Sequence, residues 1–70
     1  MNASTAITIA RKHVGNGASM DSSARLCLSD ALVLEAAGEY GSARSRALRS
    51  LGYSVGIFHA DYQRVAAAVK

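Results

Sequence analysis

The chain has 70 residues, a formal net charge of +3 and a single cysteine, Cys27. This length allows one domain, which we predict to span residues 1–70, and the single cysteine excludes an intrachain disulfide. Half of the residues are apolar, and many of these are alanine, which favours helix but removes little surface from water. We therefore expect a small core that depends on close helix packing or on a partner chain.

The N-terminal segment does not read as a signal peptide, because Arg11 and Lys12 follow its apolar stretch instead of preceding it. No apolar run approaches the length of a membrane span. We therefore expect a cytoplasmic protein without membrane contact. The modest positive charge permits an anionic partner but does not require one.

Proline is absent, and six glycines divide the chain into four segments that we predict to be helical. The first runs roughly from residue 4 to residue 14, with Ser4 as N-cap and basic residues in the last turn. The alternation of residues 7–9 and the Asn16-Gly17 pair also fit a β-hairpin. The residues that follow do not read as a returning strand, so helix is favoured.

The second segment, roughly residues 19–37, is predicted to be an amphipathic helix capped by Ser19. One apolar face follows the helical spacing, and its members are Ala24, Cys27, Leu28, Ala31 and Leu34. A second apolar line on the opposite side consists of Leu26, Val33 and Ala37. A helix that is apolar on two faces should be covered on both. The C-terminal helices can cover one face, and the first helix or another chain must cover the other.

The third segment, roughly residues 42–55, is predicted to pack on the second through alanines, serines and leucines. Its inner face comprises Ala43, Ala47, Leu48, Leu51 and Val55, and Ala43, Ala47, Ser50 and Ser54 form a row of small side chains. Small side chains let two helix backbones approach closely. The fourth helix is predicted roughly over residues 60–69. Ile57 and Phe58 in the connector before it are expected to be buried.

The junction between the second and third helices, residues 37–43, reads Ala-Gly-Glu-Tyr-Gly-Ser-Ala. It resembles the turn of a tetratricopeptide helical hairpin, whose typical form is Gly-x-Tyr-x-x-Ala. The resemblance covers residues 27–53 and implies that Gly38 ends one helix, Tyr40 fills the wedge and Ala43 permits close approach. It also implies a scaffold for partner proteins. The chain holds one such hairpin where the family repeats it, and Asp30 stands where the family has an apolar residue.

The same junction is similar to the turn and recognition helix of helix-turn-helix repressors, through Ala37-Gly38 and residues 45–48. Those proteins place apolar residues at the core-facing positions of this motif. Here the matching positions hold Glu39, Tyr40 and Arg44, and burial of an unpaired charge is costly. The plain helical hairpin is therefore the favoured interpretation.

Few residues suggest catalysis or metal binding. Cys27 could act as a nucleophile with His13 or His59 as base, but a lone cysteine in an apolar stripe is more typical of a core residue. The two histidines could bind metal with Cys27 or Asp61, yet they match no known ligand spacing. No acid–base pair or phosphate-binding loop is evident. We therefore expect no catalytic activity, no metal and no cofactor.

The third helix carries the best candidate for a partner-binding surface, formed by Arg46, Arg49 and Tyr53 at i, i+3 and i+7. Arginine pairs with carboxylate or phosphate in a forked geometry, and tyrosine adds rigid contact area. The same pattern also fits an ordinary solvated face. Two arginines give few phosphate contacts, which weakens a nucleic-acid interpretation.

These observations predict an all-α fold, a small bundle of three to four helices around a central antiparallel hairpin. The predicted function is a noncatalytic protein-binding module, either an adaptor or a small inhibitor of a larger protein. The line of Leu26, Val33 and Ala37 is the candidate face for homodimerisation. The alternative is a nucleic-acid-binding regulator that uses the basic face of the third helix.

Overall fold

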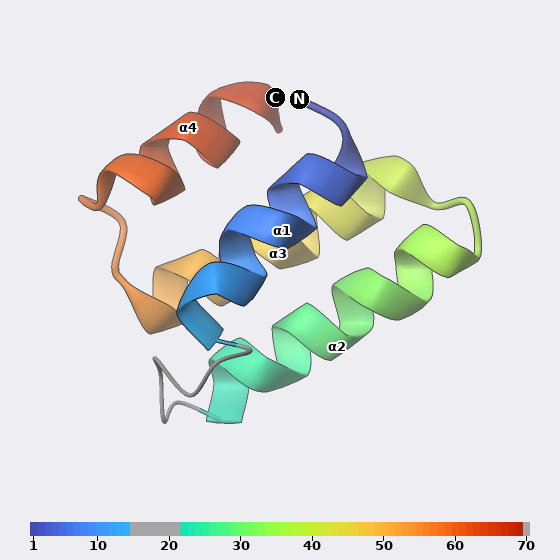
Figure 1. Ribbon diagram of the computed structural model, residues 1–70, viewed down its shortest axis with the longest axis horizontal. Coiled ribbons are helices and arrows are strands. Elements are labelled where there is room, and N and C mark those ends of the chain that lie inside the picture. The colour runs from blue at the N-terminus through green and yellow to red at the C-terminus, as the bar shows by residue number, and fades with distance from the viewer. Residues whose placement is uncertain (15–21, 70) are drawn as a thin grey trace.

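The computed structural model describes residues 1–14 and 22–69. The described residues form four helices, α1 Ala3–Val14, α2 Ser22–Ala36, α3 Tyr40–Ser54 and α4 Ala60–Ala68, and no strand. The prediction of an all-α bundle is confirmed. The helices α2 and α3 form the central antiparallel pair, α1 packs against both, and α4 lies along α3 on the side opposite α2 (Figure 1). None of the described helices is both long and apolar enough to span a membrane.

The start of α1 differs from the sequence prediction in its capping residue. The backbone N–H of Thr5 donates to the Asn2 side-chain oxygen Oδ1 at 2.8 Å, so Asn2 supplies the cap that was assigned to Ser4. Because the helix starts at Ala3, Ser4 is already inside the first turn. The predicted cap Ser19 and the glycines at positions 15 and 17 lie outside the described residues.

The turn between α2 and α3 depends on Gly38, whose φ of +82° lies in the left-handed region. Its N–H donates to the Glu35 carbonyl at 3.0 Å, and the N–H of Glu39 donates to the Leu34 carbonyl at 2.9 Å. This pair of bonds is the Schellman arrangement, which satisfies the last carbonyl groups of α2. The prediction that Gly38 ends the helix is confirmed.

The next residues along the chain, Tyr40 and Gly41, belong to α3. Tyr40 does not fill a wedge between the helices, since 57% of the residue is exposed. The physical reason is that α3 begins at Tyr40, so this residue occupies the first turn of the helix. Gly41 lies inside the first turn of α3 and is not among the glycines with positive φ. Gly38 alone therefore supplies the unusual backbone geometry of this turn.

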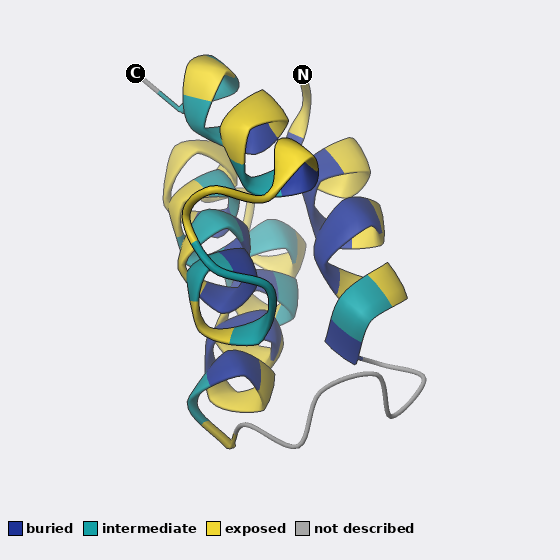
Figure 2. Cartoon of the chain, turned by 90° about the vertical axis from the view of Figure 1, so that its left-hand side faces the viewer, coloured by how far each residue is buried: buried dark blue, intermediate teal, exposed yellow. Residues whose placement is uncertain are grey.

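The contact between α2 and α3 consists mainly of small side chains. Ala31, Ala43 and Ala47 are fully buried, so the helix backbones approach closely. The buried hydroxyl of Ser50 donates to the Ala24 carbonyl oxygen at 2.8 Å, which satisfies this polar group within the contact. Figure 2 shows the buried residues on the sides where the helices face one another.

Helix α1 completes the core over one side of the hairpin but leaves the second apolar line of α2 uncovered. Ala6 and Ala10 of α1 are fully buried. In contrast, Leu26 is 66% exposed and Val33 is 68% exposed, and Ala37 is also exposed. The first helix therefore does not cover this line, which remains available on the surface of the chain.

Alanine substitutions at two glycines of the same junction test this account of the turn. Gly38→Ala is expected to lower the free energy of unfolding by about 1–2 kcal/mol, because the left-handed conformation is unfavourable for a residue with a Cβ. Gly41→Ala is expected to raise it by up to about 1 kcal/mol, because alanine is the better helix former and the added Cβ meets no atom closer than 3.9 Å. Denaturant-induced unfolding measures both values, and destabilisation by Gly41→Ala would contradict its placement within α3.

Candidate functional site

A groove of about 380 Å³ runs along the outer face of α3 beside α4. We call it the α3 groove. Its lining combines apolar, aromatic and basic side chains, contributed by Ser45, Leu48, Arg49, Gly52, Tyr53, Ile57, Tyr62 and Val69. These residues come from α3, from the connector after it, from α4 and from the residue that follows α4. The two helices therefore form the groove together.

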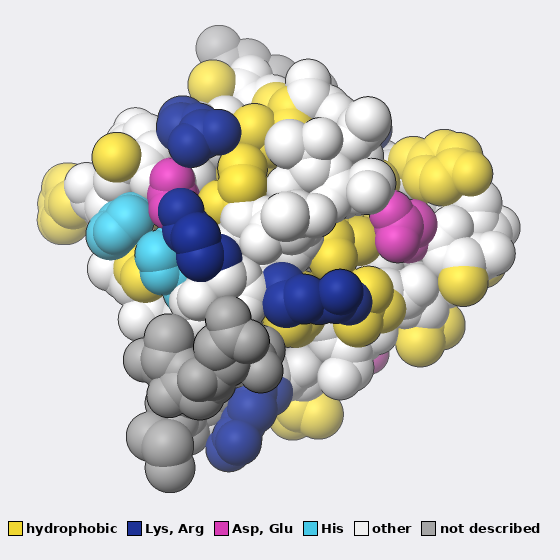
Figure 3. Space-filling model, viewed as in Figure 1, with side chains coloured by type: hydrophobic (Ala, Val, Ile, Leu, Met, Phe, Trp, Pro, Cys, Tyr) yellow, Lys and Arg dark blue, Asp and Glu magenta, His cyan; other side chains and the backbone are white. Residues whose placement is uncertain are grey.

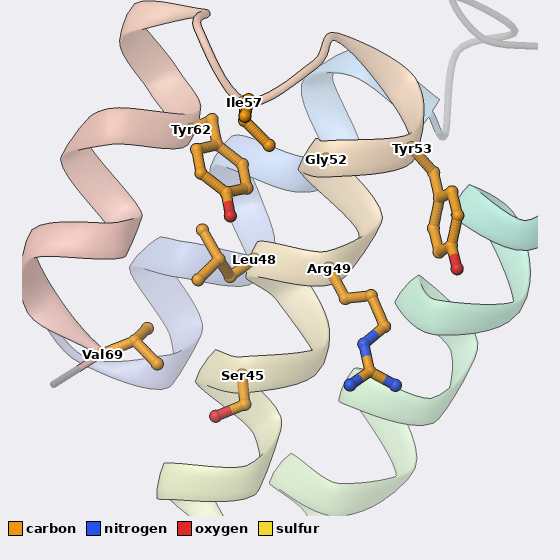
Figure 4. Close-up of a pocket in the computed structure, with 8 residues that line it drawn as sticks. All are labelled: Ser45, Leu48, Arg49, Gly52, Tyr53, Ile57, Tyr62 and Val69. Atoms are coloured by element: carbon orange, nitrogen blue, oxygen red, sulfur yellow. The ribbon is translucent and has the colours of Figure 1, made fainter.

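The side chains of the α3 groove point to two sides of α3 (Figure 4). Leu48 and Tyr62 lie between α3 and α4, whereas Arg49 and Tyr53 extend toward α2. Gly52 lies between these two sets on the same helix. A Cβ built at this position would be 3.3 Å from a ring carbon of Tyr62. The absence of a side chain at Gly52 therefore allows the Tyr62 ring to lie close to the α3 backbone.

Arg46 lies beside the α3 groove, in two shallow hollows between α2 and α3. One hollow is lined by Leu34, Ser42, Ser45, Arg46 and Arg49, and the other by Asp30, Val33, Leu34 and Arg46. The first shares Ser45 and Arg49 with the α3 groove. The three predicted residues Arg46, Arg49 and Tyr53 thus border one continuous surface, which we call the outer α3 surface. Tyr53 is 50% exposed.

The connector between α3 and α4 exposes the residues that were expected to be buried. Ile57 is 52% exposed and Phe58 is 91% exposed, so the prediction of buried plugs is wrong. Gly56 has a φ of +90° and turns the chain, while the Gln63 amide donates to the Ile57 carbonyl at 2.6 Å. The backbone is therefore held against α4, where Ile57 borders the α3 groove and Phe58 remains almost fully exposed.

A second cluster of polar side chains, which we call the Asp61 cluster, joins the end of α1 to the start of α4. Asp61 Oδ2 lies 2.7 Å from His13 Nε2 and 3.0 Å from Lys12 Nζ, and Oδ1 lies 3.3 Å from a guanidinium nitrogen of Arg64. The backbone N–H of Asp61 donates to His59 Nδ1 at 3.0 Å, which makes His59 the N-cap of α4. Figure 3 shows both histidines beside an acidic group and basic side chains at one edge of the molecule.

Electrostatics and hydrogen bonding at Asp61 favour its ionised form. The hydrogen bond from His13 and that from Lys12 lower the pKa of the carboxyl from 3.8 to about 2, against the opposing effect of burial. The Asp61 side chain is 10% exposed, whereas those of Lys12 and Arg64 are 61% and 60% exposed. The carboxylate is therefore the buried centre of the cluster, surrounded by groups that reach out to solvent.

Sequence reasoning weighed the two histidines as metal ligands with Cys27 or Asp61 but predicted no metal, and it did not single out Arg64. It interpreted His13 as a cation at the end of a helix and His59 as a polar residue of a loop or helix start. His59 does cap α4, yet the contact between His13 and Asp61 spans 48 positions and carries no local signal. Cys27, the other metal ligand considered, is a buried free thiol in α2 and is not part of the group that brings His13, His59 and Asp61 together.

Comparison of the chain with protein-family models, with curated proteins and with solved structures gave no match.

The stability of the chain should depend on the charge of Asp61. The lowered pKa means that the unfolded chain binds a proton at higher pH than the folded chain, so stability is present above pH 3.8 and is lost as the pH falls through about 2. We expect the free energy of unfolding to fall by about 1–2 kcal/mol from this group, since solvent screens the exposed partners Lys12 and Arg64.

Denaturant-induced unfolding of the chain and of Asp61→Asn at a series of acidic pH values measures this contribution. The variant should lose less stability than the unaltered chain between about pH 4 and pH 2. Parallel loss in the two proteins would show that His13 and Lys12 do not stabilise the carboxylate.

Proposed function

We propose that this chain is a noncatalytic protein-binding module whose outer α3 surface binds an amphipathic helix that carries acidic side chains. The observation that supports the proposal is the continuity of this surface. Apolar residues of the α3 groove lie beside Arg49, and both arginines border neighbouring hollows that share lining residues along α3. A helix laid in such a groove would meet apolar contacts along its centre and positive charge at one edge.

The two arginines favour a partner with carboxylates. Among the described residues, no ion pair engages Arg46 or Arg49, since the recorded ion pairs all involve Asp61. A guanidinium group forms paired hydrogen bonds with a carboxylate, and such bonds are stronger than those between neutral groups. The net charge of +3 also favours the approach of an acidic partner.

The aromatic and aliphatic residues of the same surface favour a protein over a polyanion. Tyr53 and Ile57 are half exposed at the edge of the α3 groove, and Phe58 follows at 91% exposure. Tyrosine and arginine are enriched among the residues that carry most of the energy of protein interfaces. A nucleic acid would contact the arginines but would leave most of the aliphatic surface without a binding partner.

The noncatalytic part of the proposal is supported by the position of the one thiol. Cys27 is buried in α2 and is not part of the group in which His13 and His59 come together with Asp61. A cysteine nucleophile needs a base within hydrogen-bonding distance. This arrangement gives Cys27 the role of a core residue.

Selection from a displayed library of random peptides tests the partner chemistry directly. We expect the full chain to enrich peptides that combine apolar residues at helical spacing with glutamate or aspartate. The double substitution Arg46→Ala and Arg49→Ala should weaken binding of the selected peptides by at least about tenfold, because each lost charged hydrogen bond contributes roughly 1.5 kcal/mol or more. Fluorescence anisotropy of a labelled peptide measures this change.

The matched control is Arg25→Ala, which removes an exposed arginine of α2 outside the outer α3 surface and should leave peptide binding unchanged. Enrichment of basic peptides, or equal loss of binding in the control, would contradict the proposal. Duplex DNA is the competing probe. Salt-sensitive DNA binding that disappears in the Arg46 and Arg49 variant, without selection of acidic peptides, would replace the proposal with the nucleic-acid alternative.

The exposed line of α2 supports self-association as a second property of the module. Leu26 and Val33 are separated by two helical turns and are both about two-thirds exposed, and exposed apolar residues of this size often mark an interface. We expect sedimentation equilibrium to show a dimer that Leu26→Glu with Val33→Glu converts to a monomer. A chain that sediments as a monomer at high concentration would remove this part of the proposal.

A further inference from the structure

We propose that His13, His59 and Asp61 form a zinc-binding site that fastens the C-terminal end of α1 to the first turn of α4. These residues come from three places in the fold, namely the last turn of α1, the connector after α3 and the start of α4. One donor atom from each residue lies within 4.8 Å of the other two. No other group of histidine, cysteine and carboxylate residues comes together in this way among the described residues.

Two imidazoles and one carboxylate form a donor set that suits zinc. Zinc takes histidine nitrogen at about 2.0–2.1 Å and carboxylate oxygen at about 2.0–2.2 Å, so two ligand atoms of one tetrahedral ion lie roughly 3.3 Å apart. His13 Nε2 and Asp61 Oδ2 are 2.7 Å apart, so these two atoms must separate by roughly 0.6 Å to hold the ion between them. The exposed His59 can move toward the same point, and water would complete the tetrahedral shell.

At His13, a zinc ion can replace the proton that now lies between the imidazole and the Asp61 carboxylate. The carboxylate is ionised and accepts hydrogen bonds, so His13 Nε2 is the donor in its contact with Oδ2. A zinc ion would take the place of that proton, which in neutral His13 moves to Nδ1. The single lone pair of His59 Nδ1 accepts the hydrogen bond from the Asp61 N–H at 3.0 Å, so this bond must break when the imidazole turns to bind the ion through that atom.

The basic side chains next to Asp61 affect how tightly the site is expected to bind zinc. Lys12 contacts the same carboxylate oxygen as His13, at 3.0 Å, and Arg64 contacts the other oxygen at 3.3 Å. Both side chains are about 60% exposed and can turn away into solvent. Lys12 nevertheless competes with zinc for Oδ2, because two positive charges at this separation repel each other. Removal of Lys12 should therefore strengthen zinc binding, whereas removal of a ligand should weaken it.

Such a site would reinforce the least anchored helix. Among the described helices, α4 packs mainly against α3, and the Asp61 cluster is its polar connection to α1. A ligand that binds only the folded state adds to its stability, and small domains commonly use a metal in this way. Because the cluster is separate from the outer α3 surface, the inference does not depend on the proposed function.

Zinc titration of the full chain, followed by calorimetry and by the NMR signals of the two histidine rings, tests the proposal. We expect one zinc ion to bind per chain and the unfolding temperature to rise. The NMR signals of both histidine rings should shift and stop changing at one equivalent of zinc. His59→Ser keeps an N-cap acceptor for α4 but removes the imidazole, and it should weaken zinc binding by at least about tenfold, since even the loss of a supporting neighbour has this effect. Asp61→Asn should weaken it similarly.

Lys12→Met should have the opposite effect on affinity and tighten zinc binding by about tenfold, because it removes a competing positive charge. Arg25→Met removes an exposed cation of α2 and Glu35→Gln removes a carboxylate of α2, and neither residue contacts Asp61; these matched controls should leave zinc affinity unchanged. Absence of zinc binding would overturn the proposal. Zinc affinity that is equal in the unaltered chain and in a folded His59→Ser variant, or that falls in Lys12→Met, would overturn it as well.

Discussion

The close approach of α2 and α3 is the constraint on which the rest of the structure depends. A chain of 70 residues with one phenylalanine and no tryptophan cannot fill wide gaps between helices. Fully buried alanines at positions 31, 43 and 47 solve this problem by removing the gap, so that many weak dispersion contacts form between backbones. The left-handed Gly38 makes the reversal sharp enough for this contact to begin directly after the turn.

The hairpin combines small and large residues in its core and leaves other large residues on its surface. Alanines occupy much of the inner face beside the buried Leu28 and Leu51, whereas Leu26 and Val33 of α2 remain exposed. The groove beside α4 also depends on a small residue, because Gly52 lets an aromatic ring of α4 lie close to the α3 backbone. The candidate binding surface therefore depends on where small residues stand in α3.

Helix α4 links the two candidate sites, because consecutive residues at its start face different neighbours. Asp61 is buried against the end of α1 and accepts contacts from His13 and Lys12, whereas Tyr62 lines the α3 groove. The first turn of α4 therefore contributes one residue to each candidate site.

The sequence by itself determined the four helices, their approximate limits, the left-handed Gly38 and the packing faces of α2 and α3. These features follow from the spacing of apolar residues and from the conformational freedom of glycine, which act within a few residues along the chain. The exposed line of Leu26 and Val33 was also recognisable, although the sequence left open what covers it.

Only the tertiary structure decided which distant residues meet. The exposure of Phe58, the outward position of Tyr40 and the assembly of His13 with Asp61 depend on where α1 and α4 lie against the hairpin. No periodicity encodes a contact across 48 positions, because such a contact is fixed by the sum of many packing choices in between. For the same reason the sequence supplied the residues of both candidate sites, while the fold supplied their arrangement.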